Sequence, residues 1–279
     1  MIHVKILLFI VSIGFSIVGH AQELMAYKLD IQLNEISGLE QLNETTLVAI
    51  NDSGNEAELH LIDLQGKPIK KVFVKNATNV DWEDLARDDN YLYIGDIGNN
   101  QNKRKDLCVY KVKIADVLSK KEVAAQKISF NYSDQKEFPP SKNEQNFDAE
   151  GMIVYKESIY IFSKNRTEPW TGISNVYTLP KQAGSYTAKK YSELYVGEQG
   201  WWQDAITGAD VFNDQLYVLT YNRVFCLNIA DLDRKPSFTQ EFKRMTQKES
   251  IVVLDKNTFF IADEVKRFMG GGNLYKIEK

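Results

Sequence analysis

Glu35-Ile36-Ser37-Gly38-Leu39 begins as a polar turn and runs into an apolar strand, and four further stretches of the chain repeat this arrangement. They are Asp81-Trp82-Glu83-Asp84-Leu85, Asp148-Ala149-Glu150-Gly151-Met152, Ala205-Ile206-Thr207-Gly208-Ala209 and Gln247-Lys248-Glu249-Ser250-Ile251. The third residue of each stretch carries an oxygen side chain. We call these the ring residues, because a toroidal repeat fold would bring them to one point on its axis: Ser37, Glu83, Glu150, Thr207 and Glu249.

Each stretch is followed by a strand of aromatic and β-branched residues and then by a third strand, both with the period-2 alternation of antiparallel meanders. The second strands are expected at residues 46–50, 91–94, 158–162, 215–219 and 258–262. The third strands are expected at residues 58–62, 107–110, 175–179, 223–227 and 273–277. A fourth strand follows in four of the units, at residues 69–74, 126–132, 186–195 and 237–242.

The fifth unit has no fourth strand of its own, because the chain ends at Lys279. Residues 25–33 form an unassigned strand that can complete it, which is the way a β-propeller closes. The sequence therefore predicts an all-β, five-bladed β-propeller as a single domain over residues 22–279. A sixth, irregular blade within residues 115–145 is the alternative, and residues 114–123 are predicted to form a short helix inserted in blade two.

Residues 1–21 have the features of a signal peptide. Lys5 precedes the mostly apolar run 6–19, and Gly19-His20-Ala21 supplies small residues for cleavage near Ala21. The run is shorter than the roughly 20 residues that a membrane-spanning helix needs. We therefore expect a secreted or periplasmic protein without a membrane span. The net charge of −4 and the absence of basic runs argue against a nucleic acid polymer as partner.

Cysteine and histidine offer little chemistry in the predicted mature chain. Cys108 and Cys226 fall on third strands of non-adjacent units, too far apart for a disulfide, so buried free thiols are expected. His60 is the one histidine after residue 21, and its alternating strand favours an ordinary strand histidine over a catalytic one.

The ring residues combine three carboxylates with two hydroxyls. Carboxylates about 5 Å apart repel by roughly 3 kcal/mol per pair at an effective dielectric of 20, so a cation, protonation or distance must compensate them. Oxygen-only ligands favour calcium over zinc. The alternative is that the ring residues only cap the turns that begin their strands. A second set of acids precedes the ring residues and could hold a second species: Glu35, Asp81, Asp148 and Asp204.

The loops between second and third strands open on the same face as the ring. They carry basic side chains such as Lys164 and Arg166 together with Trp170, and Trp201 lies on the same side in the entry to blade four. Cationic groups beside an acidic, cation-filled centre would suit an anionic small molecule, and tryptophan is available for stacking.

The ring residues on five predicted blades resemble those of the calcium-activated nucleotidases, the secreted apyrase family. Residues 35–39 with 49–53, and residues 82–86 with 92–95, look like that family's first two blades. The resemblance implies one calcium in the channel, bound by Ser37, Glu83, Glu150, Thr207 and Glu249, and hydrolysis of nucleoside di- and triphosphates. Residues 81–86 with 93–98 also resemble uncharacterised bacterial secreted propellers, which imply no activity.

Two functions remain open from the sequence. The first is a calcium-dependent hydrolase of phosphate esters or anhydrides, in which Asp52 or Asp96 is the general base and Arg166 with Lys164 holds phosphate oxygens. The second is a non-catalytic propeller that binds an extracellular glycan, peptide or protein and in which the metal is structural.

Overall fold

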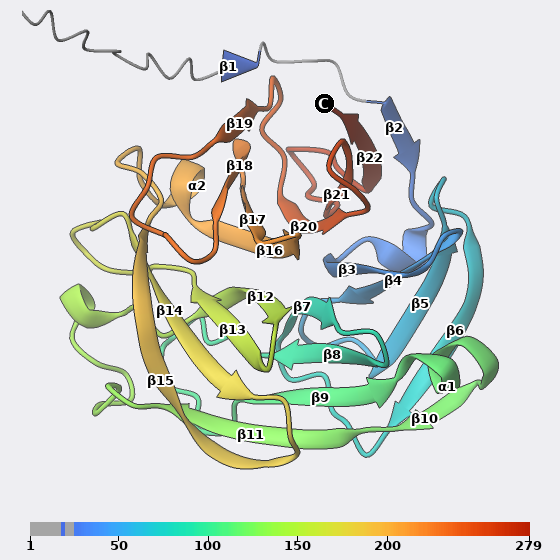
Figure 1. Cartoon of the computed structure of the whole chain (residues 1–279), viewed down its shortest axis with the longest axis horizontal. Coiled ribbons are helices and arrows are strands. Elements are labelled where there is room, and N and C mark those ends of the chain that lie inside the picture. The colour runs from blue at the N-terminus through green and yellow to red at the C-terminus, as the bar shows by residue number, and fades with distance from the viewer. Residues whose placement is uncertain (1–17, 20–24) are drawn as a thin grey trace, which may run out of the picture.

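A computed structural model describes residues 18–19 and 25–279 of the chain. Within these residues the strands pair in five antiparallel series of four, and we call each series a blade (Figure 1). Blades one and two are β3 (Ile36–Asn43), β4 (Thr46–Asn51), β5 (Glu58–Asp63) and β6 (Pro68–Lys75), then β7 (Trp82–Arg87), β8 (Tyr91–Asp96), β9 (Cys108–Lys113) and β11 (Gln126–Tyr132). Blades three and four are β12 (Ala149–Tyr155), β13 (Ser158–Ser163), β14 (Ile173–Pro180) and β15 (Gly184–Tyr195), then β16 (Ile206–Phe212), β17 (Gln215–Thr220), β18 (Arg223–Asn228) and β19 (Phe238–Glu241). Blade five is β20 (Lys248–Val253), β21 (Thr258–Asp263), β22 (Asn273–Glu278) and β2 (Met25–Lys28).

The first strands of the blades surround a central channel. β3 contacts β7, β7 contacts β12, β12 contacts β16, β16 contacts β20, and β20 contacts β3 again, which closes the circle (Figure 1). Residues at the start of these strands therefore face one another around the axis, as the repeat pattern predicts.

The N-terminal strand completes blade five. β2 pairs antiparallel with β22, from Met25 opposite Lys276 to Lys28 opposite Asn273. The strand is shorter than the predicted 25–33, because the Asp30 carboxylate accepts a hydrogen bond from the Gln32 amide (2.9 Å) and starts the 3-10 turn η1 (Ile31–Leu33). The predicted closure is confirmed, and the predicted length is wrong.

The segment after β9 also differs from the prediction. The helix α1 (Ile114–Ser119) ends before Lys120, and β10 (Glu122–Ala124) pairs in parallel with β6 of blade one. Val123 is buried in the apolar layer between blades one and two, which accounts for a strand where the helix was expected to continue. β11 likewise pairs in parallel with β15, so blades two and three form one continuous sheet.

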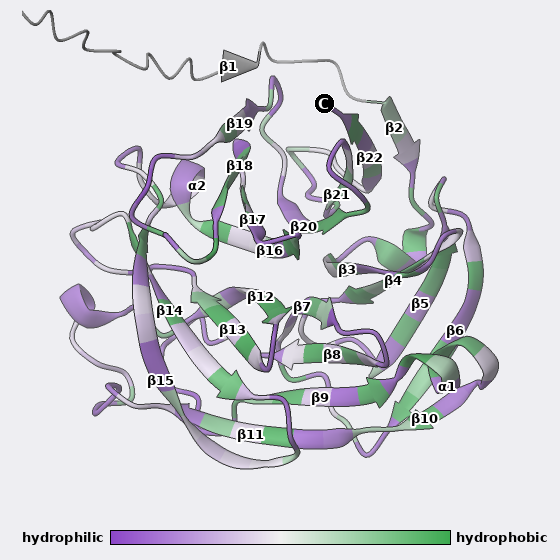
Figure 2. Cartoon of the chain, viewed as in Figure 1, coloured by the Kyte–Doolittle hydropathy of each residue, from purple (hydrophilic) through white to green (hydrophobic). Residues whose placement is uncertain are grey.

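Apolar side chains fill the spaces between neighbouring blades. Five buried clusters each join one pair of blades; for example, Val48 and Leu59 of blade one pack with Trp82 and Ile94 of blade two. Figure 2 shows the alternation of hydrophobic and hydrophilic residues along the strands that produces these layers. Fully burying one such aliphatic side chain contributes roughly 1.5–3 kcal/mol.

The remaining short elements are β1 (Val18–Gly19), which pairs with β19, and η2 (Lys142–Glu144) and α2 (Trp201–Asp204). The predicted signal peptide, apart from residues 18–19, lies outside the described residues. No helix in the described part of the chain is long and apolar enough to cross a bilayer. Cys108 and Cys226 are both buried free thiols, as expected.

Candidate functional site at the channel mouth

A β-bulge marks every ring residue. Near the start of the first strand of each blade, its pairing with the second strand skips one residue, and these skipped residues are Ser37, Glu83, Glu150, Thr207 and Glu249. A bulge leaves its extra residue out of the ladder and turns its side chain away from the regular alternation. The five predicted positions thus share one local backbone geometry, which sequence inspection did not reveal.

Four of the five bulged residues converge on one pocket of about 140 Å³ at the channel mouth. Four ring residues line it together with the predicted catalytic residues Asp52, Lys164 and Arg166; the four are Ser37, Glu83, Glu150 and Glu249. The fifth, Thr207, is 1% exposed, and its hydroxyl has no hydrogen-bond partner among the described residues. The other lining residues are Asn100, Trp201, Tyr221, Gln247, Glu264 and Lys266.

Lys164 is the built-in cation of the pocket. Its Nζ lies 2.5 Å from Glu150 Oε2 and 4.0 Å from Glu249 Oε2, and it donates to the Tyr221 hydroxyl (2.9 Å). Burial alone would lower the pKa of Lys164, but Glu150, Tyr221 and Glu249 together raise it well above its usual value. A permanent ammonium therefore neutralises part of the ring. The sequence places this lysine in a loop on the face of the ring, and its side chain is only 4% exposed.

Most of the acids that precede the ring residues have partners. Asp148 accepts from Arg166 Nε (2.7 Å), and Asp204 lies 2.6 Å from Arg223 Nη1. Glu35 accepts from the Asn55 amide (2.7 Å). Three of the four predicted second-set acids are thus used within the fold.

Asp81 is the exception, and Glu83 shares its situation. Asp81 and Glu83 are 9% and 5% exposed, and no donor among the described residues reaches either carboxylate. Together with Asp52 they present one oxygen each within 4.8 Å of one another. Burial, followed by the charge of Asp52, raises the pKa of Asp81 to about 7, and burial with Glu150 and Asp52 raises that of Glu83 well above its usual value.

Asp96, the other predicted base, does not line the pocket. It is 1% exposed, lies 2.8 Å from Arg104 Nη2, and accepts a hydrogen bond from the Asp81 amide (3.1 Å). This carboxylate therefore supports the backbone on which Asp81 and Glu83 are placed. Its pairing with Arg104, eight residues further along the chain, is a contact that sequence spacing alone does not reveal.

An open groove adjoins the ring pocket. Its volume is about 500 Å³, and it shares Asn100, Arg166 and Trp201 with the ring pocket. Trp170 and Pro169 supply its apolar wall. Arg166 thus borders both spaces, and a ligand in the groove could reach the acidic centre with one end.

Asp84 lies next to the bulge of blade two and is fully buried in the channel. Its carboxylate accepts from the amides of Leu85 and Met152 (both 2.8 Å) and from that of Ala209 (3.4 Å). One side chain thereby ties together blades two, three and four below the ring.

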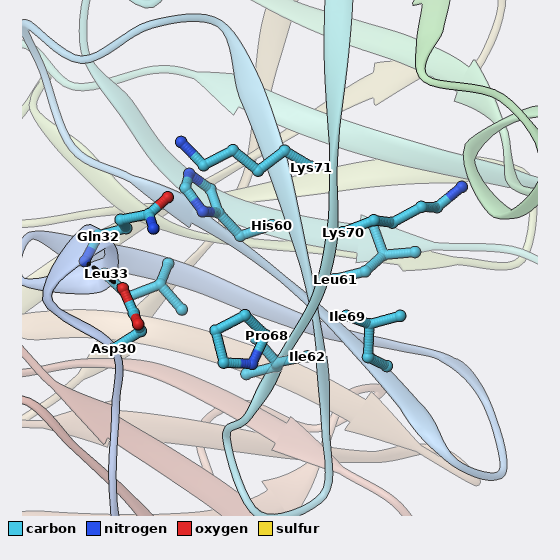
Figure 3. A pocket seen from close by; sticks show the side chains of 10 residues that line it. All are labelled: Asp30, Gln32, Leu33, His60, Leu61, Ile62, Pro68, Ile69, Lys70 and Lys71. Carbon is cyan, nitrogen blue, oxygen red and sulfur yellow. Dashed lines mark hydrogen bonds between the residues drawn. The ribbon is translucent and has the colours of Figure 1, made fainter.

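A third pocket, of about 210 Å³, surrounds His60 on blade one (Figure 3). Its lining residues come from the η1 turn with Asp30 before it and from strands β5 and β6, and they include Leu33, Ile62 and Pro68. Burial lowers the pKa of His60 to about 4, so the imidazole is neutral at physiological pH. His60 is an ordinary strand histidine, in agreement with the sequence.

The raised acid pKa values predict how stability changes with pH in cation-free protein. Burial raises the pKa of Asp81, Glu264 and Asp210 to about 7, so the folded state holds protons that the unfolded state has lost above pH 4. The free energy of unfolding should therefore fall as the pH rises from about 4 to 7. His60 has a pKa lowered to about 4, so its own contribution to stability rises with pH and offsets part of this fall. We expect a lower Tm in EDTA at pH 8 than at pH 5, measured by circular dichroism.

The variant Asp81→Asn should show a shallower fall in Tm over the same pH range. A Tm in EDTA that rises from pH 5 to pH 8 in the natural protein would contradict this interpretation.

Comparisons with known proteins identify the kind of fold. No protein-family model matches the sequence, and no curated protein matches it. Similar solved structures include the glutaminyl cyclase of Myxococcus xanthus (TM-score 0.56, 10% identity, 92% of this chain and 95% of that one covered). The PQQ-bound aldose sugar dehydrogenase of Streptomyces coelicolor is similar as well (TM-score 0.54, 10% identity, 92% and 98% covered).

The chain is a β-propeller, and the predicted fold class is confirmed. At this level of identity the likeness concerns the fold alone. It supports the propeller part of the predicted resemblance and does not single out the calcium-activated nucleotidases.

Proposed function

We propose that this protein is an exported β-propeller that holds calcium at its channel mouth and binds an anionic small molecule beside the cation. The observation that carries the proposal is the convergence of Glu83, Glu150 and Glu249 with Lys164 and Arg166 in one pocket. Export rests on the predicted signal peptide at residues 1–21.

The donor set suits a hard cation. Among the described residues no donor reaches the Glu83 carboxylate, and Ser37 donates to the Trp82 carbonyl (2.8 Å), which leaves its oxygen lone pairs available. Oxygen ligands of this kind are those that calcium accepts, six to eight at a time. When bound, calcium would position an anionic substrate and offset negative charge that develops on it.

The pocket also offers groups for hydrolysis of a phosphate ester or anhydride. The Arg166 side chain is 21% exposed and borders both pockets, so its guanidinium can hold phosphate oxygens, while Lys164 adds positive charge from below. Asp52 lines the pocket and is partly exposed, which suits a base that takes a proton from water. Two structural neighbours are named as enzymes, which supports catalysis on a propeller of this shape.

A non-catalytic role is the second candidate. The groove places Trp170 and Trp201 beside Arg166, and aromatic faces of this kind also bind sugars or peptide side chains. In that case calcium would be structural, and the partner would be an extracellular glycan, peptide or protein.

Phosphate release tests the hydrolase. The mature protein should release phosphate from at least one member of a panel of nucleotides and phosphate esters with calcium, and not with a chelator. Arg166→Ala should reduce the rate about 10²–10³-fold, as loss of one transition-state donor does. Arg234→Ala, which removes an exposed arginine paired with Asp231, is the matched control and should leave the rate unchanged. No release from any member above a Glu83→Gln control would favour the binding role.

A further inference from the structure

We infer that the cation lies off the channel axis, held by Asp52, Asp81 and Glu83, and that Lys164 takes the place of a cation for the rest of the ring. This inference rests on the proposed function and narrows it. It replaces the five-residue ligand set predicted from the sequence with a set that shares only Glu83 with it, and it assigns Asp52 to the cation in place of the role of base.

The first support is the distribution of donors around the acids. Of the ring carboxylates, Glu150 is paired with Lys164 and Glu249 accepts from the Gln247 side chain (3.1 Å). Glu83 and Asp81 have no such donor among the described residues although both are more than nine-tenths buried. Because no described residue donates to these two carboxylates and little of either residue is exposed, their oxygens are left for water or for a cation that the protein does not itself supply.

The second support is the backbone behind the two carboxylates. Gly98 lies directly against them, and a Cβ at this position would overlap both the Glu83 Oε1 and the Asp81 Oδ2 atoms. Its peptide is fixed by neighbours, since the Gly98 amide donates to the Asp81 carbonyl (3.2 Å) and its carbonyl accepts from Arg104 (2.8 Å). The fold thus holds a glycine where a side chain would displace both carboxylates.

The third support is size. Calcium–oxygen distances of about 2.3–2.6 Å place ligands on opposite sides of the ion about 4.6–5.2 Å apart. The three acids offer oxygens that all lie within 4.8 Å of one another, so one calcium ion can contact all three without a large rearrangement. Three protein carboxylates leave further coordination positions, and Asp52, which is partly exposed, leaves them open to water or to an anionic ligand.

Lys164 explains why the calcium ion would lie on one side of the ring only. Its ammonium lies within 4.0 Å of both Glu150 and Glu249, where a second cation would otherwise be expected. The channel mouth is therefore bipolar: a divalent cation on the side of blades one and two faces Lys164 and Arg166 of blade three. An anion bound between them would contact positive charge on both sides.

Calcium titration of the chelator-stripped mature protein by isothermal calorimetry separates the two ligand sets. We expect one calcium ion per chain. Asp81→Asn should lower the calcium affinity by about 10–100-fold or more, because changes to residues that only support a metal ligand already have an effect of that size. Glu249→Gln and Thr207→Val should bind as the natural protein does. Glu35→Gln is the matched control, because Glu35 occupies the position of Asp81 in blade one and already has a partner. Circular dichroism melting in EDTA verifies that each variant is folded.

Loss of affinity in Glu249→Gln or Thr207→Val overturns the off-axis site and leaves the proposed calcium protein standing with a five-residue ring. Full affinity in Asp81→Asn overturns it as well. Absence of both binding heat and a calcium-dependent Tm in the natural protein overturns the inference and the proposed function together.

Discussion

Lys164→Met should lower the free energy of unfolding by about 3–5 kcal/mol in EDTA at pH 8, the cost of removing one partner from a buried ion pair. Methionine keeps much of the length of the side chain, so the change isolates the charge. Glu150 and Glu249 would then remain buried without their ammonium. Urea unfolding followed by circular dichroism measures the loss.

Two conditions should reduce this loss. At pH 5 the carboxylates take up protons more readily, because burial already raises the pKa of Glu249 well above its usual value. Calcium should raise the Tm of Lys164→Met more than that of the natural protein, since a second cation can occupy the position of the ammonium.

The control is Lys142→Met, which removes an exposed lysine paired with an exposed Glu168. Such pairs contribute about 0–1 kcal/mol. If Lys164→Met also stays within 1 kcal/mol of the natural protein, Lys164 is not the internal cation of the ring.

Asp84→Ala should cost about 3 kcal/mol or more. The substitution leaves the buried amides of Leu85 and Met152 without an acceptor, at about 1–3 kcal/mol for each unsatisfied group, and weakens a third contact to Ala209. Because these amides belong to three blades, we also expect faster hydrogen exchange along β7, β12 and β16.

Asp84→Asn keeps an acceptor and should cost clearly less. Asp89→Ala, at an exposed position in the turn after β7, should stay within about 0.5 kcal/mol. Equal stabilities of Asp84→Ala and the natural protein would show that these blades are not joined through Asp84.

The alternation of buried and exposed residues was sufficient to predict most of the fold. The second strand predicted at residues 46–50 is β4, and the one predicted at 158–162 is β13, each with one further residue. Local alternation carries no information about partners far along the chain. The parallel pairings of β10 with β6 and of β11 with β15 could therefore not be read from it.

The position of the candidate site could be predicted from the sequence, whereas the contacts between its side chains were harder to predict. The repeat placed four ring residues at one pocket with Lys164 and Arg166. Burial of Lys164 could not be predicted, because a lysine after a strand usually extends into solvent. The difference between Asp81 and Asp148 was equally hidden, since both precede a ring glutamate and only the folded chain brings Arg166 to Asp148.

The bulges give this propeller an unusual freedom for redesign. A side chain that stands outside the ladder can be exchanged without changing which face of the strand its neighbours occupy. Each of the five bulged positions can therefore be substituted separately while the pairing of the strands is kept.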